Sequence, residues 1–178
     1  APYPGVDGEL AQDFMEQFVR AYPGSVLVWC GGLDSIMDTR KAYLLIEQYC
    51  STARVIYPHQ TIIPHQNLVF SETCYNIVQG DNAAMLQHIS VLGPLQGQKD
   101  EADIWKTLAA YLIDTDKSVT RAAGLLHVHE STVKYRLNKI NRRLGYDITQ
   151  MPANYYLYRA LAIKRLLDYQ AQQKELYR

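Results

Sequence analysis

Before residue 100, the apolar positions of the chain alternate between helical spacing and short continuous runs. Leu10, Phe14 and Phe18 recur every four residues, which predicts an amphipathic helix. This helix is expected to end near Pro23, and the apolar run Val26–Trp29 predicts a short buried strand after it. Together these elements indicate a small α/β domain.

The pattern continues with a second helix, predicted from Asp34 to about Cys50. Its inward-facing positions are expected to be Ile36, Ala42, Tyr43 and Ile46. The other elements expected in this part are short strands at Arg54–Tyr57 and Asn67–Phe70 and helices at residues 72–79 and 82–92.

After residue 100, every apolar segment has helical spacing. One helical face is formed by Ile104, Trp105, Leu108, Ala109 and Leu112. Ser118 suits the N-cap of a short helix that is expected to end near Leu126. Ala123 is small, so a second helix can cross this one closely.

A tight corner at His127–His129 leads into a longer helix, predicted from Glu130 to Leu144. Gly145 then provides the residue that most often ends a helix. Pro152 suits the first turn of a last helix, expected to run to about Gln172. Two short-linked helices around a corner indicate a helix-turn-helix.

These patterns predict an α+β fold that is mostly helical. The polar run Gln96–Asp100 marks the expected boundary. Residues 1–97 are expected to form a small α/β domain that links, dimerises or transmits a signal. Residues 98–178 are expected to form an all-helical helix-turn-helix domain that binds DNA.

The formal net charge is zero, but the charges are unevenly distributed. Residues 1–98 hold 4 basic and 9 acidic side chains, a net of −5. Residues 117–143 hold 7 basic and 1 acidic side chain, a net of +6. A basic segment of this kind is typical either of a solvated helix face or of a surface for a polyanion.

The helix predicted at Glu130–Leu144 separates apolar from polar positions. Its apolar stripe consists of Val133, Leu137, Ile140 and Leu144. The opposite face carries Ser131, Tyr135, Asn138 and Arg142, flanked by Lys134 and Lys139. One buried side and one hydrogen-bonding, cationic side are what a helix needs in order to read the major groove of DNA.

Positions near the start of a recognition helix reach base edges in helix-turn-helix proteins. Glu130 is expected to accept from a cytosine amino group, and Lys134 to donate to guanine. Phosphate contacts are expected from Ser118, Thr120, Arg121, Lys139 and Arg142. The full set of candidate DNA-binding residues is Ser118, Thr120, Arg121, His129, Glu130, Ser131, Thr132, Lys134, Tyr135, Asn138, Lys139 and Arg142.

The text "AAGLLHVHESTVKYRLNKINRRLG" (Ala122–Gly145), with "WKTLAAYL" before it and "YDI" after it, resembles the C-terminal part of PucR/CdaR-type bacterial transcription regulators. The resemblance implies a DNA-binding regulator without enzymatic activity. Residues 25–92 more loosely resemble the degenerate α/β domain, related to diguanylate cyclases, that precedes this module in the family. Glu130 departs from the family's pattern, where a basic residue is usual. The family's separate sensory domain for a small-molecule effector is expected to lie outside this chain.

The stretch "CGGLDS" (Cys30–Ser35) resembles the phosphate-binding loop of ATP pyrophosphatases, since glycines before a helix admit a phosphate to the backbone. That loop would begin with serine rather than Cys30, and no downstream charged cluster suits magnesium. The favoured interpretation is a turn whose Asp34 or Ser35 caps the next helix. A nucleotide-binding enzyme remains the alternative, as does a helix-turn-helix used only for protein interaction.

The three cysteines lie at wide spacing, which favours a reducing cytoplasm, and no spacing indicates a metal site or a cofactor. No apolar run is long enough for a membrane span, and no signal peptide is evident. The last helix is apolar nearly all round, so it is expected to pack on the helix-turn-helix and on a second surface. We expect a homodimer, because paired half-sites add specificity.

Overall fold

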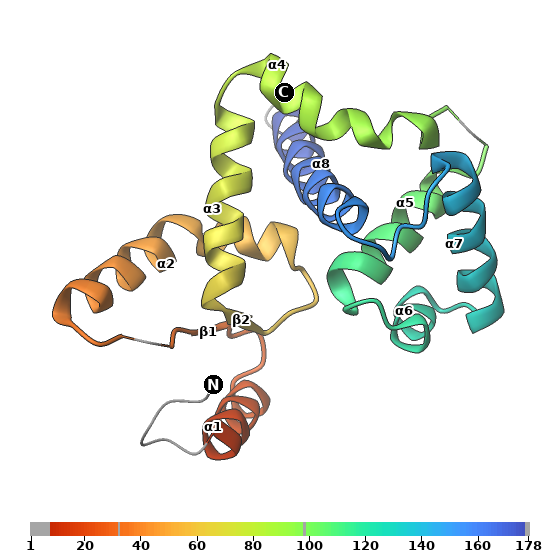
Figure 1. Cartoon of the computed structure of the whole chain (residues 1–178). Coiled ribbons are helices and arrows are strands. Elements are labelled where there is room, and N and C mark those ends of the chain that lie inside the picture. Colours follow the sequence, from red (N-terminus) through yellow and green to blue (C-terminus); the bar gives the residue numbers. More distant parts are fainter. Residues whose placement is uncertain (1–7, 32, 98, 177–178) are drawn as a thin grey trace. The chain divides into compact units, whose positions relative to one another are not determined.

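The computed structural model describes residues 8–31, 33–97 and 99–176 (Figure 1). The chain divides into two compact units, Ala1–Thr73 and Cys74–Arg178, and the division falls within α3 (His65–Gln79). The fold is α+β and mostly helical, as the sequence predicts. The functional boundary expected between residues 97 and 98 stays a prediction.

The first unit joins three helices to a small parallel sheet. Its elements are α1 (Gly8–Ala21), β1 (Leu27–Trp29), α2 (Ile36–Ile56), β2 (Ile62–Pro64) and the start of α3. The two strands pair in parallel, with Leu27 opposite Ile62, and α2 makes the crossover that parallel pairing requires. The buried apolar residues of the unit are Ala42, Ala53, Ile56, Tyr57, Ile63 and Leu68.

Two strands predicted in this part are wrong. Arg54–Tyr57 begins in the last turn of α2, where Ala53 and Ile56 are buried three residues apart. Asn67–Phe70 belongs to α3, where Leu68, Ser71 and Cys74 repeat every three residues and are all fully buried. Both segments are short apolar runs, in which only packing separates a helix from a strand.

The predicted inward face of α2 is also only partly correct. Ala42 is buried, but Ile36 is 88% exposed and Tyr43 is 63% exposed. The buried positions of α2 begin at Ala42, and its first turn is mostly exposed. Ser35 caps α2, because its Oγ accepts from the backbone N–H of Asp38 at 3.1 Å. This agrees with a capping role for the CGGLDS turn.

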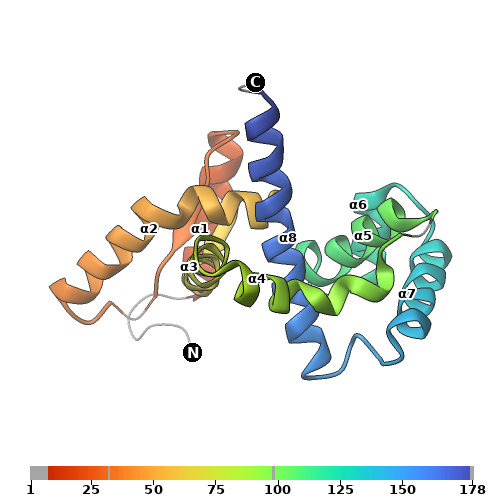
Figure 2. The same cartoon turned by 90° about the horizontal axis from the view of Figure 1, so that it is seen from above.

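Helices fill the second unit. They are the rest of α3, α4 (Asn82–Ile89), the 3-10 helix η1 (Ser90–Leu95), α5 (Glu101–Ala109), the π-helix η2 (Ala110–Asp114), α6 (Val119–Leu126), α7 (Glu130–Leu144) and α8 (Ala153–Leu176). Figures 1 and 2 show α5, α6 and α7 as one group of helices. The bounds of α6 and α7 are those that the sequence predicts.

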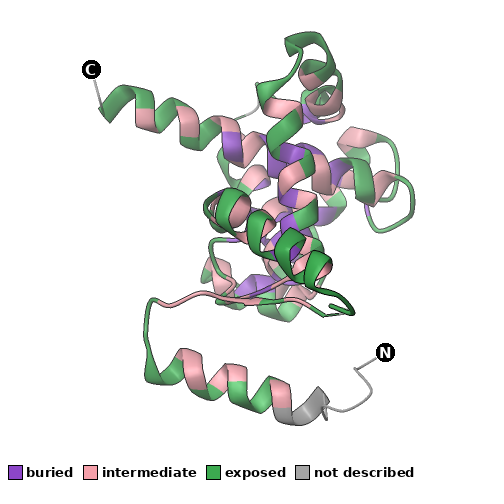
Figure 3. Cartoon of the chain, turned by 90° about the vertical axis from the view of Figure 1, so that its left-hand side faces the viewer, coloured by how far each residue is buried: buried purple, intermediate pink, exposed green. Residues whose placement is uncertain are grey.

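The central part of α8 is buried against α4, η1 and η2. In Figures 1 and 2, α4 crosses α8 on the side away from α6. The buried residues of α8 are Leu157, Ala160, Leu161, Ala162, Ile163 and Leu166. The nearly continuous apolar surface of this helix therefore has partners within its own unit. Figure 3 shows that the C-terminal turns of α8 are mainly exposed.

One deeply placed ion pair joins η2 to α8. Arg165 donates to both carboxylate oxygens of Asp114, at 2.8 and 2.6 Å. The side chain of Asp114 is 3% exposed and that of Arg165 is 20% exposed. Because η2 continues α5, these two hydrogen bonds connect α5 and the helices packed on it to α8.

No helix within the described residues combines the length and the apolar character needed to cross a membrane.

Candidate nucleic-acid interface

Three helices build the site. α7 packs against α6 and α5 through its apolar stripe, of which Val133 and Ile140 are fully buried and Leu137 is 9% exposed. Leu144, the last member of the stripe, is half-buried. On α6, Ala122 and Ala123 are buried where α7 crosses. The predicted buried face of α7 is therefore confirmed.

The corner between α6 and α7 is held by backbone geometry. His127 takes a left-handed conformation with a φ of 53°, which ends α6. The N–H of Val128 then donates to the carbonyl oxygen of Ala123 at 3.1 Å. Gly145, with a φ of 78°, ends α7 in the same left-handed region. These two turns set the length and direction of α7.

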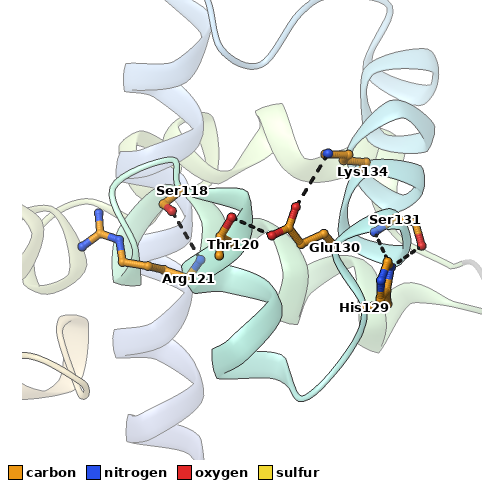
Figure 4. A network of polar contacts seen from close by, with 7 residues as sticks. All are labelled: Ser118, Thr120, Arg121, His129, Glu130, Ser131 and Lys134. Carbon is orange, nitrogen blue, oxygen red and sulfur yellow. Dashed lines mark hydrogen bonds and ion pairs between the residues drawn. The ribbon is translucent and has the colours of Figure 1, made fainter.

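Side chains cap both helices, and the cap at Ser118 is the one that the sequence predicts. The Ser118 hydroxyl accepts from the N–H of Arg121 at 3.3 Å. His129 caps α7, because its Nδ1 accepts from the N–H of Ser131 at 3.2 Å and lies 2.8 Å from the Ser131 hydroxyl (Figure 4). The capping role of Ser118 was predicted and that of His129 was not, and both side chains belong to the scaffold of the site.

The outer face of α7 is the surface that the sequence singles out. Its exposed residues are Ser131, Lys134, Tyr135, Asn138 and Arg142, with Thr132 half-buried beside them. Tyr135 is 65% exposed, so its ring and hydroxyl are both accessible from solvent. Arg142 has no ion-pair or hydrogen-bond partner within the described part of the chain. Its guanidinium is available to an external anion.

Glu130 lies between α6 and the outer face of α7. The Thr120 hydroxyl donates to Glu130 Oε1 at 2.7 Å, and Lys134 Nζ lies 3.7 Å from Glu130 Oε2 (Figure 4). A carboxylate at the first residue of a helix also interacts favourably with the helix dipole. Glu130 thus ties the start of α7 to α6 and holds Lys134 near the N-terminal end of the face.

The Arg121 side chain points away from Glu130 and Lys134 (Figure 4). Its guanidinium donates to the carbonyl oxygen of Thr115 at 2.7 Å, and Figure 4 shows it directed away from Glu130 and Lys134. Thr115 itself is buried, and its hydroxyl donates to the carbonyl oxygen of Ala110 across the π-helix η2. Arg121 therefore supports the turn before α6 while it stays exposed to solvent.

A second side of α7 carries cations that are already paired. Lys139 Nζ lies 2.7 Å from Asp100, Arg143 Nη2 lies 2.9 Å from the same carboxylate, and Arg136 lies 2.6 Å from Asp103. We call these five residues the α5–α7 ion-pair strip. The sequence analysis missed this strip, although the spacing of Arg136, Lys139 and Arg143 at i, i+3 and i+7 marks one helix side.

The strip divides the basic residues of α7 into two groups. Hydrogen bonds from Lys139 and Arg143 lower the pKa of Asp100 from 3.8 to about 2. Lys139, expected to contact phosphate, is thus committed to an acidic partner within the protein. Lys134 and Arg142 are the cations left on the outer face.

The low pKa of Asp100 predicts an acid-dependent stability. A carboxyl whose pKa falls on folding stabilises the folded state above its unfolded pKa, near 3.8, and loses this effect as pH falls toward 2. We expect the thermal midpoint of the native chain to exceed that of Asp100→Asn above about pH 4. The difference should shrink progressively toward pH 2. If the difference in thermal midpoint, measured by circular dichroism, did not change with pH, the ionised Asp100 carboxylate would not be the source of this stability.

The described residues contain no cluster of three or more His, Cys, Asp or Glu side chains placed to hold a metal ion. At the CGGLDS turn, the Ser35 hydroxyl donates to Asp38 Oδ2 at 2.7 Å and caps α2 as described. Gly32 lies outside the described residues. The local contacts of this turn are those of a helix start.

This arrangement defines the class of the domain: a helix-turn-helix with a solvent-facing, cationic second helix. Residues 104–163 match the family model of the PucR C-terminal helix-turn-helix domain. The match supports a DNA-binding transcription regulator with DNA as its partner, a type of protein that is typically not an enzyme. The match covers about a third of the chain. The α/β part lies outside the match, so its expected relation to diguanylate cyclases stays a prediction. Neither the curated proteins nor the solved structures include a significant match.

Proposed function

We propose that the protein is a sequence-specific transcription regulator that inserts α7 into the major groove of DNA and acts as a homodimer. The observation that carries the proposal is the exposed outer face of α7, with its two cations beside hydrogen-bonding side chains. The buried stripe fixes this face relative to α5 and α6. A DNA partner would place the protein in the cytoplasm of a bacterial cell.

The contacts divide the candidate residues into three roles. Ser131, Lys134, Tyr135 and Asn138 face the base edges, since they lie nearer the N-terminal end of the outer face than Arg142 does. Arg142 and Arg121 contact phosphates, which position the protein without specifying sequence. The remaining candidates support the face from within the protein, namely Ser118, Thr120, His129, Glu130, Thr132 and Lys139.

Adjacent arginines provide a matched test of this proposal. Arg142 is exposed and has no partner among the described residues, whereas Arg143 donates to Asp100 and buries its Nη1. Arg142→Ala should flatten the slope of log K against log salt by about 0.9, because one phosphate contact is lost. Arg143→Ala should leave the slope unchanged and lower the free energy of unfolding by about 1 kcal/mol.

The measurement is fluorescence anisotropy with duplex fragments from upstream of the protein's own gene, between about 50 and about 200 mM salt. Equal slopes for both variants and the native chain would contradict a DNA-facing Arg142. Binding without a steep salt dependence would favour a helix-turn-helix that serves protein interaction. Chemical denaturation of the same samples reports the separate loss of stability in Arg143→Ala.

A further inference from the structure

Helix α2 has apolar residues on two opposite sides. At 100° per residue, the buried Ala42, Ala53 and Ile56 lie on one side of the helix. Ile36 and Tyr43 lie about 100–120° around the helix from Ala42, and Met37 and Leu44 lie on the side opposite to it. These four side chains are 88%, 63%, 59% and 39% exposed, respectively. The outer face of α2 is defined here as Ile36, Met37, Arg40, Tyr43, Leu44 and Glu47.

Water is a poor environment for such a face. A helix that covers a sheet on one side is normally polar on the other, and contiguous exposed apolar patches mark interaction surfaces. The outer face of α2 instead carries four large apolar side chains beside the charged Arg40 and Glu47. The pattern indicates that the outer face of α2 is covered by a partner.

The charges on this face indicate which partner fits. Arg40 and Glu47 are both exposed and have no ion-pair partner among the residues that the structure describes. Seven residues separate them, about 10.5 Å along the helix axis, so they do not pair within one chain. They flank Tyr43 and Leu44 symmetrically, with Arg40 three residues before Tyr43 and Glu47 three residues after Leu44.

A second copy of α2, packed antiparallel about a two-fold axis between Tyr43 and Leu44, pairs the four central residues of the face with one another. Tyr43 of each chain then faces Leu44 of the other. Arg40 of each chain faces Glu47 of the other, and the two-fold axis repeats this contact, which gives two ion pairs. A two-fold interface requires such self-complementarity, whereas an unrelated protein does not.

We infer that the outer face of α2 is the surface through which two copies of this chain associate. The inference deepens the proposed function and rests on it, because paired recognition helices read paired half-sites. It assigns dimerisation to the α/β part, with the apolar residues excluding water and the two charge pairs fixing the antiparallel register.

The test measures the mass of the full chain without DNA by sedimentation velocity, from about 1 to about 100 µM. We expect a mass of two chains that dissociates on dilution. Arg40→Glu and Glu47→Arg should each weaken association at least about tenfold, since each places two pairs of like charges across the axis. The double variant Arg40→Glu/Glu47→Arg should restore the native affinity.

Lys41→Glu is the matched control, because Lys41 is exposed and lies 100° around the helix from Arg40. It makes the same change of charge and should leave association unchanged. Tyr43→Ser, at an exposed position, should weaken association without loss of helical circular dichroism. A single-chain mass at the highest concentration would overturn the inference. A dimer insensitive to both charge reversals, one not restored by the double variant, or one equally weakened by Lys41→Glu would also overturn it.

The two proposals fail separately. A chain that stays monomeric yet binds duplex DNA with a steep salt dependence refutes the α2 interface and leaves the DNA-binding function intact. A dimer with the expected charge-reversal behaviour that binds no DNA refutes the proposed function and leaves the interface intact.

Discussion

Asp114→Ala is expected to lower the free energy of unfolding of the second unit by about 3–5 kcal/mol. The substitution removes the carboxylate that accepts two hydrogen bonds from Arg165, and the Asp114 side chain is 3% exposed. Water cannot readily replace this partner, so the charge of Arg165 is left in a poorly solvated place. The effect should appear in urea denaturation followed by circular dichroism.

Asp168→Ala is the matched control on α8. Asp168 also pairs with a cation of that helix, Lys164, at 3.0 Å, but its side chain is 56% exposed. Its removal should cost only about 0.3–0.5 kcal/mol, because water solvates both groups. The double variant Asp114→Leu/Arg165→Met should recover most of the stability, since it leaves no buried charge behind. Equal losses for Asp114→Ala and Asp168→Ala would contradict the buried character of the Asp114 pair.

Lys134→Ala is expected to relax the base preference at one position of the operator by about 1–3 kcal/mol, or roughly 5- to 150-fold. Lys134 is on the second turn of α7, its side chain is 63% exposed, and Glu130 lies 3.7 Å away. A lysine in this place can donate to the N7 and O6 acceptors of guanine. Competition binding with single-base operator variants measures the change in preference.

Two variants separate base reading from general electrostatics. Lys139→Ala removes an equal charge from the same helix, but Lys139 pairs with Asp100, so base preference should persist. Glu130→Gln keeps the size of the side chain and frees Lys134, which should strengthen binding to all sequences while discrimination falls. If Lys134→Ala weakens all duplexes equally, Lys134 contacts phosphate and the base assignment is wrong.

Local sequence signals account for the helix-turn-helix with few errors. Ser118 and His129 as caps, the corner at His127 and the terminal Gly145 all depend on the backbone within a few residues. The apolar stripe of α7 has a single helical period, so its buried side follows directly. For the same reason, the outer face of α7 could be named before the structure was known.

The α/β part was harder to predict because its apolar runs are short. Arg54–Tyr57 and Asn67–Phe70 have compositions that suit either a strand or a helix, and burial of Ala53, Ile56 and Leu68 decides the outcome. The outer face of α2 was missed for a different reason. Ile36 and Tyr43 are apolar, so the sequence assigned them to the core, whereas the fold leaves them exposed.

The sequence by itself determined the class of the C-terminal domain, the bounds of α6 and α7, and the side of α7 that faces solvent. These features follow from caps, turns and one helical period, all of which are local. Only the tertiary structure decided which cations of α7 are free, because Asp103 of α5 and Asp100, which precedes α5, reach Arg136, Lys139 and Arg143. The same holds for the Asp114–Arg165 pair, whose partners lie 51 residues apart. Such contacts depend on how helices pack, which no local pattern encodes.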